Sequence, residues 1–202
     1  MSVDHYLKNN FKAYKIINWQ GEAFHYFEIK EIPDTRVLMT SGLSDFKMQV
    51  HEKHLGEEYA ELYLLLPGYW EESSLQESEN EWVFQCLSKT KKHIIDSNTW
   101  FGHGHTFSFK DLDISVFKAS DETQFMVSNP IQLQPFLPTL KSEEHDILFL
   151  SIIPVFTKEV HYKESRGTFK LMERFRQYGV TEKIDTFRQS AIKSRFNRLF
   201  KR

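Results

Sequence analysis

The sequence predicts an α/β fold of the α+β class, in which helices pack against a β-sheet. Short runs rich in β-branched and aromatic residues are typical of strands, and they occur at residues 24–29, 36–40, 59–66 and 124–127. Segments with apolar residues at helical spacing alternate with these runs. Residues 147–155 form the most apolar run of the chain and are therefore expected to be the central strand.

Two amphipathic helices are expected in the first half of the chain. Residues 3–17 carry apolar side chains near helical spacing. A second helix should follow the strand at 59–66, because two overlapping capping-box patterns begin at Ser73 and Ser74. Its expected apolar face comprises Leu75, Trp82, Val83, Cys86, Leu87, Thr90, His93 and Ile94. We therefore expect Cys86 and His93 to lie in the core.

Helices are also expected to close the domain. Residues 158–165 and 169–178 have helical periodicity, and Gly179 is expected to end the second helix. Residues 129–140 hold three prolines and should be irregular. Residues 187–202 predict a C-terminal amphipathic helix, whose apolar arc comprises Ile192, Phe196, Leu199 and Phe200. This arc is expected to dock on its own domain, although a partner or an anionic surface are alternatives.

Charge is distributed unevenly along the 202 residues. The formal net charge is −2, yet residues 185–202 hold six basic side chains against one acidic side chain. The tail therefore carries +5, which leaves −7 on residues 1–184. We divide the chain accordingly into a domain, residues 1–184, and a basic helical tail, residues 185–202. This asymmetry bears on partners and solubility, and not on the fold.

Composition narrows the class of protein. Hydrophobic residues make up 40 % of the chain, which is typical of a globular domain. The single cysteine excludes an intrachain disulfide and a cysteine metal cluster. The N-terminus lacks the layout of a signal peptide, and the longest apolar run is too short to span a membrane. We expect a cytoplasmic protein without direct contact to nucleic acid or membrane; the sequence predicts no oligomeric state.

The most unusual stretch runs from Asn98 to Thr106, where two glycines alternate with two histidines after two aromatic residues. In an extended segment, His103 and His105 would project to one face. They could then form a metal or catalytic site, with a third ligand chosen from His93, His145 and His161. Alternatively, the stretch is a tight corner whose Trp100 fills the core and whose histidines bond to backbone. Two histidines alone lack the third protein ligand of a typical zinc site, so no metal is expected.

Other catalytic patterns are also missing from the sequence. His51 and His54 lie three residues apart, whereas the zinc-protease pattern places its histidines four apart. The sequence contains neither a glycine-rich phosphate loop nor a serine nucleophile elbow. We therefore expect no catalytic residue, no cofactor and no enzymatic activity.

An acidic cluster lies around the expected start of the second helix and comprises Glu71, Glu72, Glu77, Glu79 and Glu81. One interpretation is a solvated face whose negative charge stabilises the helix N-terminus. The other interpretation is a partner-binding surface, because complementary charge accelerates association and fixes the orientation of a basic partner.

The order of several motifs resembles the suppressor of fused-like domain family over roughly residues 24–188. The resemblance runs through residues 39–45, 59–62, 66–70, 98–100, 104–106, 152–155, 167–168, 171–175 and 179–180, and ends on Asp185-x-x-Arg188. The family-motif residues expected to be structural are Ser41, Gly42, Asp45, Trp100, Gly104, His105 and Thr106. In relatives the place of His103 is open to other residues, and an apolar residue and proline stand where this chain has Phe107 and Ser108.

The resemblance implies a mixed sheet sandwiched by helices and a role in binding another protein. Compact bacterial members resemble immunity proteins of polymorphic toxin systems, including those with LXG-type toxins. The leading hypothesis is therefore an immunity protein, or antitoxin, that binds a cognate toxin and blocks it; the toxin is expected to be a nuclease. The alternatives are a regulatory module that binds a peptide, for example by strand addition, and a metal-dependent hydrolase centred on His103 and His105.

Overall fold

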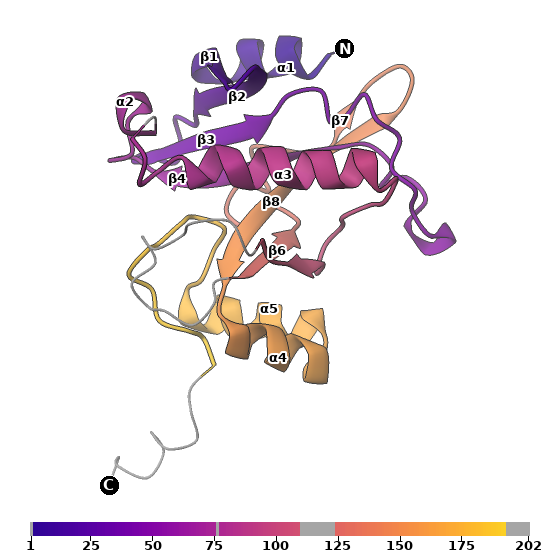
Figure 1. Ribbon diagram of the computed structural model, residues 1–202, viewed down its shortest axis with the longest axis vertical. Helices are drawn as coiled ribbons and strands as arrows, with labels where there is room; N and C mark the ends of the chain where they lie inside the picture. Colours follow the sequence, from indigo (N-terminus) through magenta and orange to yellow (C-terminus); the bar gives the residue numbers. More distant parts are fainter. Residues whose placement is uncertain (1, 76, 110–123, 193–202) are drawn as a thin grey trace, which may run out of the picture.

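The computed structural model describes residues 2–75, 77–109 and 124–192 (Figure 1). Within these residues, eight strands, five α-helices and one 3-10 turn follow one another along the chain. They are α1 (Val3–Asn10), β1 (Lys12–Trp19), β2 (Glu22–Glu28), β3 (Thr35–Thr40), η1 (Glu52–His54), β4 (Ala60–Pro67), α2 (Glu72–Leu75), α3 (Trp82–Asp96), β5 (Thr106–Phe107), β6 (Gln124–Ser128), β7 (Leu140–Lys141), β8 (Asp146–Val155), α4 (Thr157–Arg166) and α5 (Thr168–Tyr178).

The strands form one mixed sheet in the order β1-β2-β3-β4-β8-β6-β5, with β7 paired to β8. β4 and β8 are parallel, whereas the other strand pairs are antiparallel. β8 lies between β4 and β6, and nearly all its residues are buried. The prediction that residues 147–155 form the central strand is therefore confirmed, because β8 has a paired strand on each side and both its faces are covered.

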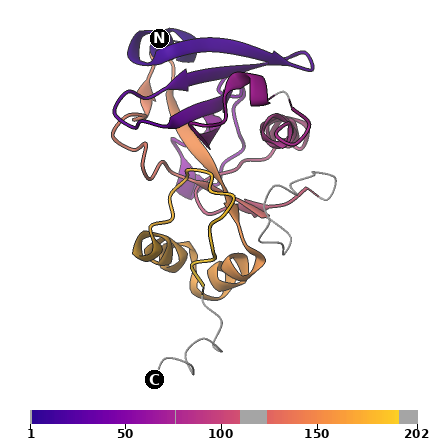
Figure 2. The same cartoon turned by 90° about the vertical axis from the view of Figure 1, so that its left-hand side faces the viewer.

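Helices cover both faces of the sheet, so the predicted sandwich is confirmed. In β3, Leu38 faces the core beneath α3, whereas Val37 and Met39 face the core beneath α1 and the irregular residues 129–139. Figure 2 shows α3 and α1 on opposite sides of the sheet. This alternation follows from the two-residue period of a strand.

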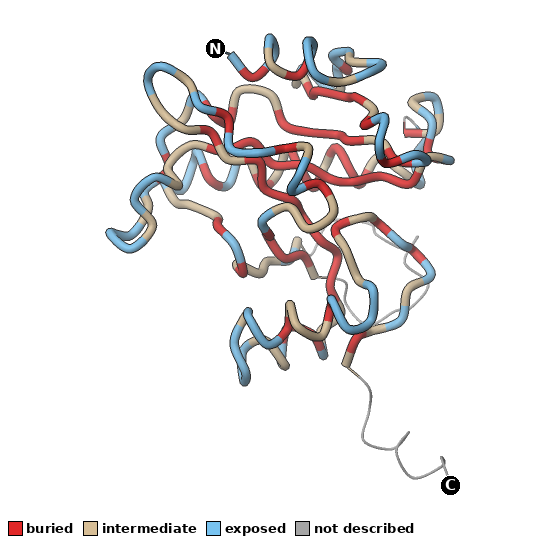
Figure 3. Tube along the Cα trace, turned by 180° about the vertical axis from the view of Figure 1, so that it is seen from behind, coloured by how far each residue is buried: buried red, intermediate tan, exposed pale blue. Residues whose placement is uncertain are grey.

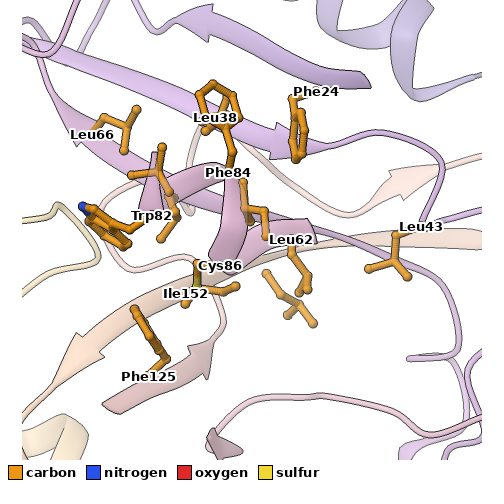
Figure 4. Packing of buried hydrophobic residues seen from close by; sticks show 14 of the residues in the cluster. Phe24, Leu38, Leu43, Leu62, Leu66, Trp82, Phe84, Cys86, Phe125 and Ile152 are labelled. Carbon is orange, nitrogen blue, oxygen red and sulfur yellow. The ribbon is translucent and has the colours of Figure 1, made fainter. Parts of the chain in front are cut away.

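The core beneath α3 contains the apolar residues of the predicted stripe (Figure 4). Trp82, Phe84 and Cys86 of α3 pack on Leu38 and Leu62 of the sheet. Cys86 is fully buried, as predicted, and burial raises the pKa of its thiol. A thiol that stays protonated behaves as a small apolar side chain.

α4 and α5 form a helical hairpin that packs on the end of β6 and β8, away from α3 (Figures 1 and 2). Leu171 and Phe175 of α5 bury against Ile153 and Val155 of β8. Gly179 ends α5 in the left-handed conformation with φ of +67°, which confirms the predicted stop. Figure 3 shows that buried residues concentrate in the strands, while the outer faces of these helices are exposed.

The prediction of one helix over residues 3–17 is wrong beyond Asn10. α1 ends there, because the N–H of Phe11 closes the last turn on the carbonyl of Leu7 and the backbone of Phe11 is extended. β1 then pairs antiparallel with β2 and becomes the edge of the sheet. Its backbone gains hydrogen bonds from β2, which the local apolar spacing does not reveal.

The predicted capping boxes at Ser73 and Ser74 are also wrong as the start of the long helix. Glu72–Leu75 makes a single separate turn, and the long helix α3 begins at Trp82. The hydroxyl of Ser74 donates to the carbonyl of Glu71 at 2.7 Å. His93 is exposed as well, so its predicted core position is wrong; it lies at the end of α3, with its ring 5.7 Å from that of Phe101.

Residues 187–192, the described part of the predicted C-terminal helix, are not helical: Phe187 lies in a turn, residues 188–190 are irregular and residues 191–192 form a bend. Phe187 is 75 % exposed, whereas Ala191 is buried and Ile192 packs on the core beneath α4 and α5. Phe196, Leu199 and Phe200 lie outside the described residues. No helix in the described ranges is both long and apolar enough to cross a bilayer.

Candidate functional site

The five glutamates of the acidic cluster lie in one continuous segment, residues 71–81, between β4 and α3. We call this stretch the acidic segment. Glu71, Glu77 and Glu79 are exposed, and Glu72 and Glu81 are half-buried. Glu72 pairs with Lys15 of β1, an edge strand of the sheet. The segment that carries the five glutamates therefore lies at one end of α3, near β1 (Figure 1).

The local chain geometry explains why this segment is accessible. Leu75 within the segment and Trp82 directly after it are buried, so they fix the segment to the body. The backbone between them turns through hydrogen bonds from Asn80 and Glu81 to the carbonyl of Glu77. Glu81 is the N-cap residue of α3, where negative charge is favourable. Both interpretations of the cluster therefore fit: helix stabilisation and an exposed anionic surface.

Trp100 lies half-buried at the edge of the core beneath α3, and not at its centre. Its ring lies between the imidazoles of His54 and His105, with both centroids 4.5 Å away. The indole also covers Gly102, where an added Cβ would come within 2.3 Å of a ring carbon. Gly102 is thus required for the indole to fold back on its own loop.

Gly104 and Thr106 join the motif loop to the helical hairpin. Gly104 has a φ of +91°, and an added Cβ would lie 2.5 Å from the hydroxyl of Thr168 at the start of α5. Its N–H donates to the carbonyl of Val127 at 2.8 Å. Thr106 accepts a hydrogen bond from Lys163 of α4 at 3.1 Å. These contacts give Gly104 and Thr106 structural roles.

The two histidines of the motif make different local contacts. His103 and Gly104 form a turn, so the stretch is not the extended segment that would align both rings. The Nδ1 atom of His103 accepts the N–H of Asn129 at 3.2 Å, and Nδ1 of His105 accepts the N–H of Gly102 at 3.4 Å. Burial lowers the pKa of both imidazoles. Neutral imidazoles can accept these bonds.

The suggested third metal ligands have other surroundings. His145 stacks on Tyr59 at 3.6 Å, and His161 is an exposed residue of α4. Among residues 2–75, 77–109 and 124–192, no group of three metal-ligating side chains is arranged to hold an ion. A hydrolase centre on His103 and His105 therefore lacks a ligand set in this part of the chain.

The Ser41–Asp45 motif is a loop organised by a buried carboxylate that the sequence reasoning missed. Glu61 of β4 is fully buried and accepts hydrogen bonds from Thr40 and from both the N–H and the hydroxyl of Ser44. Burial raises the pKa of Glu61. Gly42 takes a φ of +79°, and Asp45 is exposed. The available signal was a charged residue inside an otherwise apolar strand.

The motif tryptophan provides a test of these structural roles. Trp100→Ala is expected to lower the free energy of unfolding by about 2 kcal/mol, below the roughly 3–5 kcal/mol of a fully buried tryptophan, because Trp100 is half-exposed. Urea denaturation measures the loss, with the exposed Tyr69→Ala variant as a control that should change little. Unchanged stability combined with lost partner binding would instead make Trp100 an interface anchor.

The fold and motifs can be compared with known proteins. The family model of the suppressor of fused protein (SUFU) matches residues 19–189. Among solved structures, the chain is similar to a suppressor of fused homologue from Neisseria gonorrhoeae, with a TM-score of 0.61 and 16 % identity, covering 94 % of each chain. No curated protein matches the sequence.

Two further structures show the same fold. A chain of the Sufu–Fu complex matches with a TM-score of 0.54 and 16 % identity, over 99 % of this chain and 84 % of that one. Drosophila Suppressor of Fused matches with a TM-score of 0.53 and 14 % identity, over 93 % of this chain and 43 % of that one. Since the family match spans most of the sequence and the folds agree, this chain belongs to the suppressor of fused family.

Proposed function

We propose that this chain is an immunity protein that binds and neutralises a cognate polymorphic toxin of the LXG type. The toxin domain is a nuclease in this proposal, and the immunity protein acts by binding, without catalysis of its own. Family membership supports a protein-binding role, because a related structure is that of the Sufu–Fu complex. The acidic segment is the observation that carries the proposal.

The acidic segment fits a basic partner by its charge. A nuclease must be positively charged where it grips phosphate. An inhibitor that covers this surface gains association rate and orientation from complementary negative charge. Five carboxylates within residues 71–81, with Lys15 paired to one of them, provide such a surface. Their anchoring by Leu75 and Trp82 holds the surface in place before binding.

The test neutralises the acidic segment and measures association. The binding partner in this test is the cognate toxin domain of the proposal. Replacing Glu71, Glu72, Glu77, Glu79 and Glu81 with glutamine should slow association by about tenfold or more at low salt, and should flatten its dependence on ionic strength. Stopped-flow fluorescence across a salt series measures both effects.

A matched control removes the same number of exposed carboxylates from other surfaces: Glu31→Gln, Glu52→Gln, Asp96→Asn, Glu143→Gln and Glu144→Gln. This variant should associate nearly as fast as the wild type. A second control ends the chain after Ile192, which removes basic residues and keeps the packed part of the tail. If the neutralised segment binds normally and the control variants do not, the surface assignment is wrong.

The alternative function, a regulatory module that binds a peptide by strand addition, is favoured by one observation. β1 is an edge strand of eight residues, and its pattern is mostly exposed. An unpaired strand edge offers N–H and C=O groups to an extended peptide. In that case, Ile16→Pro in β1 should abolish partner binding while neutralisation of the acidic segment leaves it intact.

A further inference from the structure

The α4–α5 hairpin carries charge of the opposite sign to the acidic segment. Residues 157–202 contain thirteen basic and five acidic side chains, so their formal charge is +8, and residues 1–156 carry −10. The hairpin itself, residues 157–178, contains six basic and three acidic side chains. One of these acids, Glu159, is buried and paired with Arg188, so it does not offset the surface charge. α4 and α5, which lie together at one end of the molecule (Figure 1), therefore carry a net positive charge.

An apolar groove opens beside α5 at this basic end. The groove has a volume of about 410 Å³ and is lined by Ile131, Phe169, Met172, Glu173, Phe175, Arg176, Gly179, Val180 and Thr181. Phe169 is 71 % exposed at its rim. A second pocket shares Glu173 and Arg176 with the groove and is also lined by Tyr162, Lys170 and Arg174. The groove is therefore mostly apolar, and its cationic rim is formed by Arg176 together with Lys170 and Arg174 of the second pocket.

These cations act on the pKa of Glu173, the carboxylate that lies among them. A hydrogen bond from Lys170, together with the positive charges of Lys170, Arg176 and Arg174, lowers the pKa of Glu173, against a smaller opposing effect of desolvation. Lys170 binds Glu173 at 2.8 Å, and Arg174 donates to Gln177 at 2.9 Å. Lys170 and the two arginines of α5 therefore favour the ionised form of Glu173.

We propose that the groove beside α5 binds an acidic segment of a partner protein that carries one large apolar anchor residue. The anchor lies between Phe169 and Val180, and flanking carboxylates of the segment face Arg174 and Arg176. Large side chains buried in a pocket provide most of the energy in such interfaces, while surrounding charges set the orientation. This surface differs in place and sign from the acidic segment and does not rest on the toxin proposal.

Charge and burial argue against three other occupants of the groove: the chain's own tail, a second copy of the chain and a membrane surface. Residues 193–202 of the chain's own tail carry five basic side chains and no acidic one, so the cationic rim would repel them. The acidic segment of a second copy has suitable charge, but its large apolar residues, Leu75 and Trp82, are buried in their own domain. A concave pocket of this size also fits a side chain better than the flat surface of a bilayer.

The test selects ligands without assuming their sequence. A random peptide library displayed on phage is selected on the immobilised full chain and counter-selected on a Phe169→Ser/Arg176→Glu variant. Enriched peptides should carry aspartate or glutamate around a leucine, phenylalanine or tryptophan. Fluorescence anisotropy with the most enriched peptide should then show a loss of affinity of about tenfold or more for each single variant.

Two control variants test whether the loss of peptide affinity is specific to the groove. Leu55→Ser and Lys12→Glu make the same chemical changes at exposed sites away from α5 and should leave the affinity unchanged. Failure to enrich acidic peptides, or equal losses in these controls, overturns the proposal. A tenfold gain in peptide affinity on truncation after Ile192 would also overturn it, because the chain's own tail would then be the occupant of the groove. The proposal is also overturned if no peptide binds and the chain instead associates with itself or binds anionic vesicles, and if Arg176→Glu abolishes that association or binding.

Discussion

Replacing Arg188 with alanine is expected to lower the free energy of unfolding by about 3–5 kcal/mol, the range for removing one partner of a buried ion pair. The carboxylate of Glu159 is fully buried, and the side chain of Arg188 is 14 % exposed. Two guanidinium nitrogens of Arg188 bind the two oxygens of Glu159 at 2.9 and 2.8 Å. The guanidinium also donates to the carbonyl of Pro154 at 2.7 Å.

The cost arises mainly from the charge that remains. Without Arg188, the buried carboxylate of Glu159 keeps the N–H groups of Phe156 and Ala191 as donors but loses its positively charged partner. The guanidinium also lies over the rings of Phe156 and Phe175, so the variant loses these contacts too. Arg188 therefore fastens the segment after α5 to the start of α4.

Urea denaturation of Arg188→Ala measures this effect, with the exposed Arg166→Ala as a control that should cost less than about 0.5 kcal/mol. The double variant Arg188→Met/Glu159→Gln should recover part of the loss, because it leaves no buried charge. A loss below about 1 kcal/mol in Arg188→Ala would contradict the importance of the pair.

The effect should depend on pH with a defined sign. Burial alone would raise the pKa of Glu159, but Arg188 and the two N–H groups lower it below its ordinary value. A depressed carboxyl pKa stabilises the fold fully above the unfolded value of about 4.3. This contribution is lost as the pH falls through the lower, folded value. The wild type and Arg188→Ala should therefore differ most near neutral pH and converge in strong acid.

Replacing Glu182 with alanine is expected to cost about 4 kcal/mol, because three backbone donors would lose their acceptor at once. Glu182 is fully buried and accepts the N–H groups of Ile131, Gln132 and Leu133 at 3.0, 2.9 and 2.9 Å. Each buried donor left unsatisfied costs about 1–3 kcal/mol. The carboxylate thus holds the proline-containing loop of residues 129–139, for which no strand partner supplies acceptors at these positions.

A local readout separates this role from a general loss of packing. Hydrogen exchange of the amides of residues 131–133 should accelerate strongly in Glu182→Ala, beyond the acceleration of the strand amides in β3. Glu182→Gln keeps one acceptor oxygen and should cost less than the alanine variant. Equal stability of Glu182→Ala and the wild type, with unchanged exchange at residues 131–133, would show that the loop does not depend on Glu182.

Several elements were predictable because their residues are in contact with near neighbours along the chain. The apolar spacing from Trp82 to Ile94 predicted most of the face that α3 buries, but His93, at the end of the helix, was wrongly placed on it and the buried Phe84 was missed. The prolines of residues 129–140 predicted irregular structure because proline removes a backbone donor. The acidic segment was equally visible, since its five glutamates are adjacent in sequence.

The sequence by itself determined the mixed architecture, the buried strand β8, the helices α4 and α5, and the clustering of acidic charge, because periodicity and composition are local properties. Only the tertiary structure decided that residues 12–19 join the sheet and that His103 and His105 have separate partners. It also decided that Glu61, Glu159 and Glu182 are buried. A buried carboxylate is stable only where distant donors converge on it, and such convergence leaves no periodic signal in the chain.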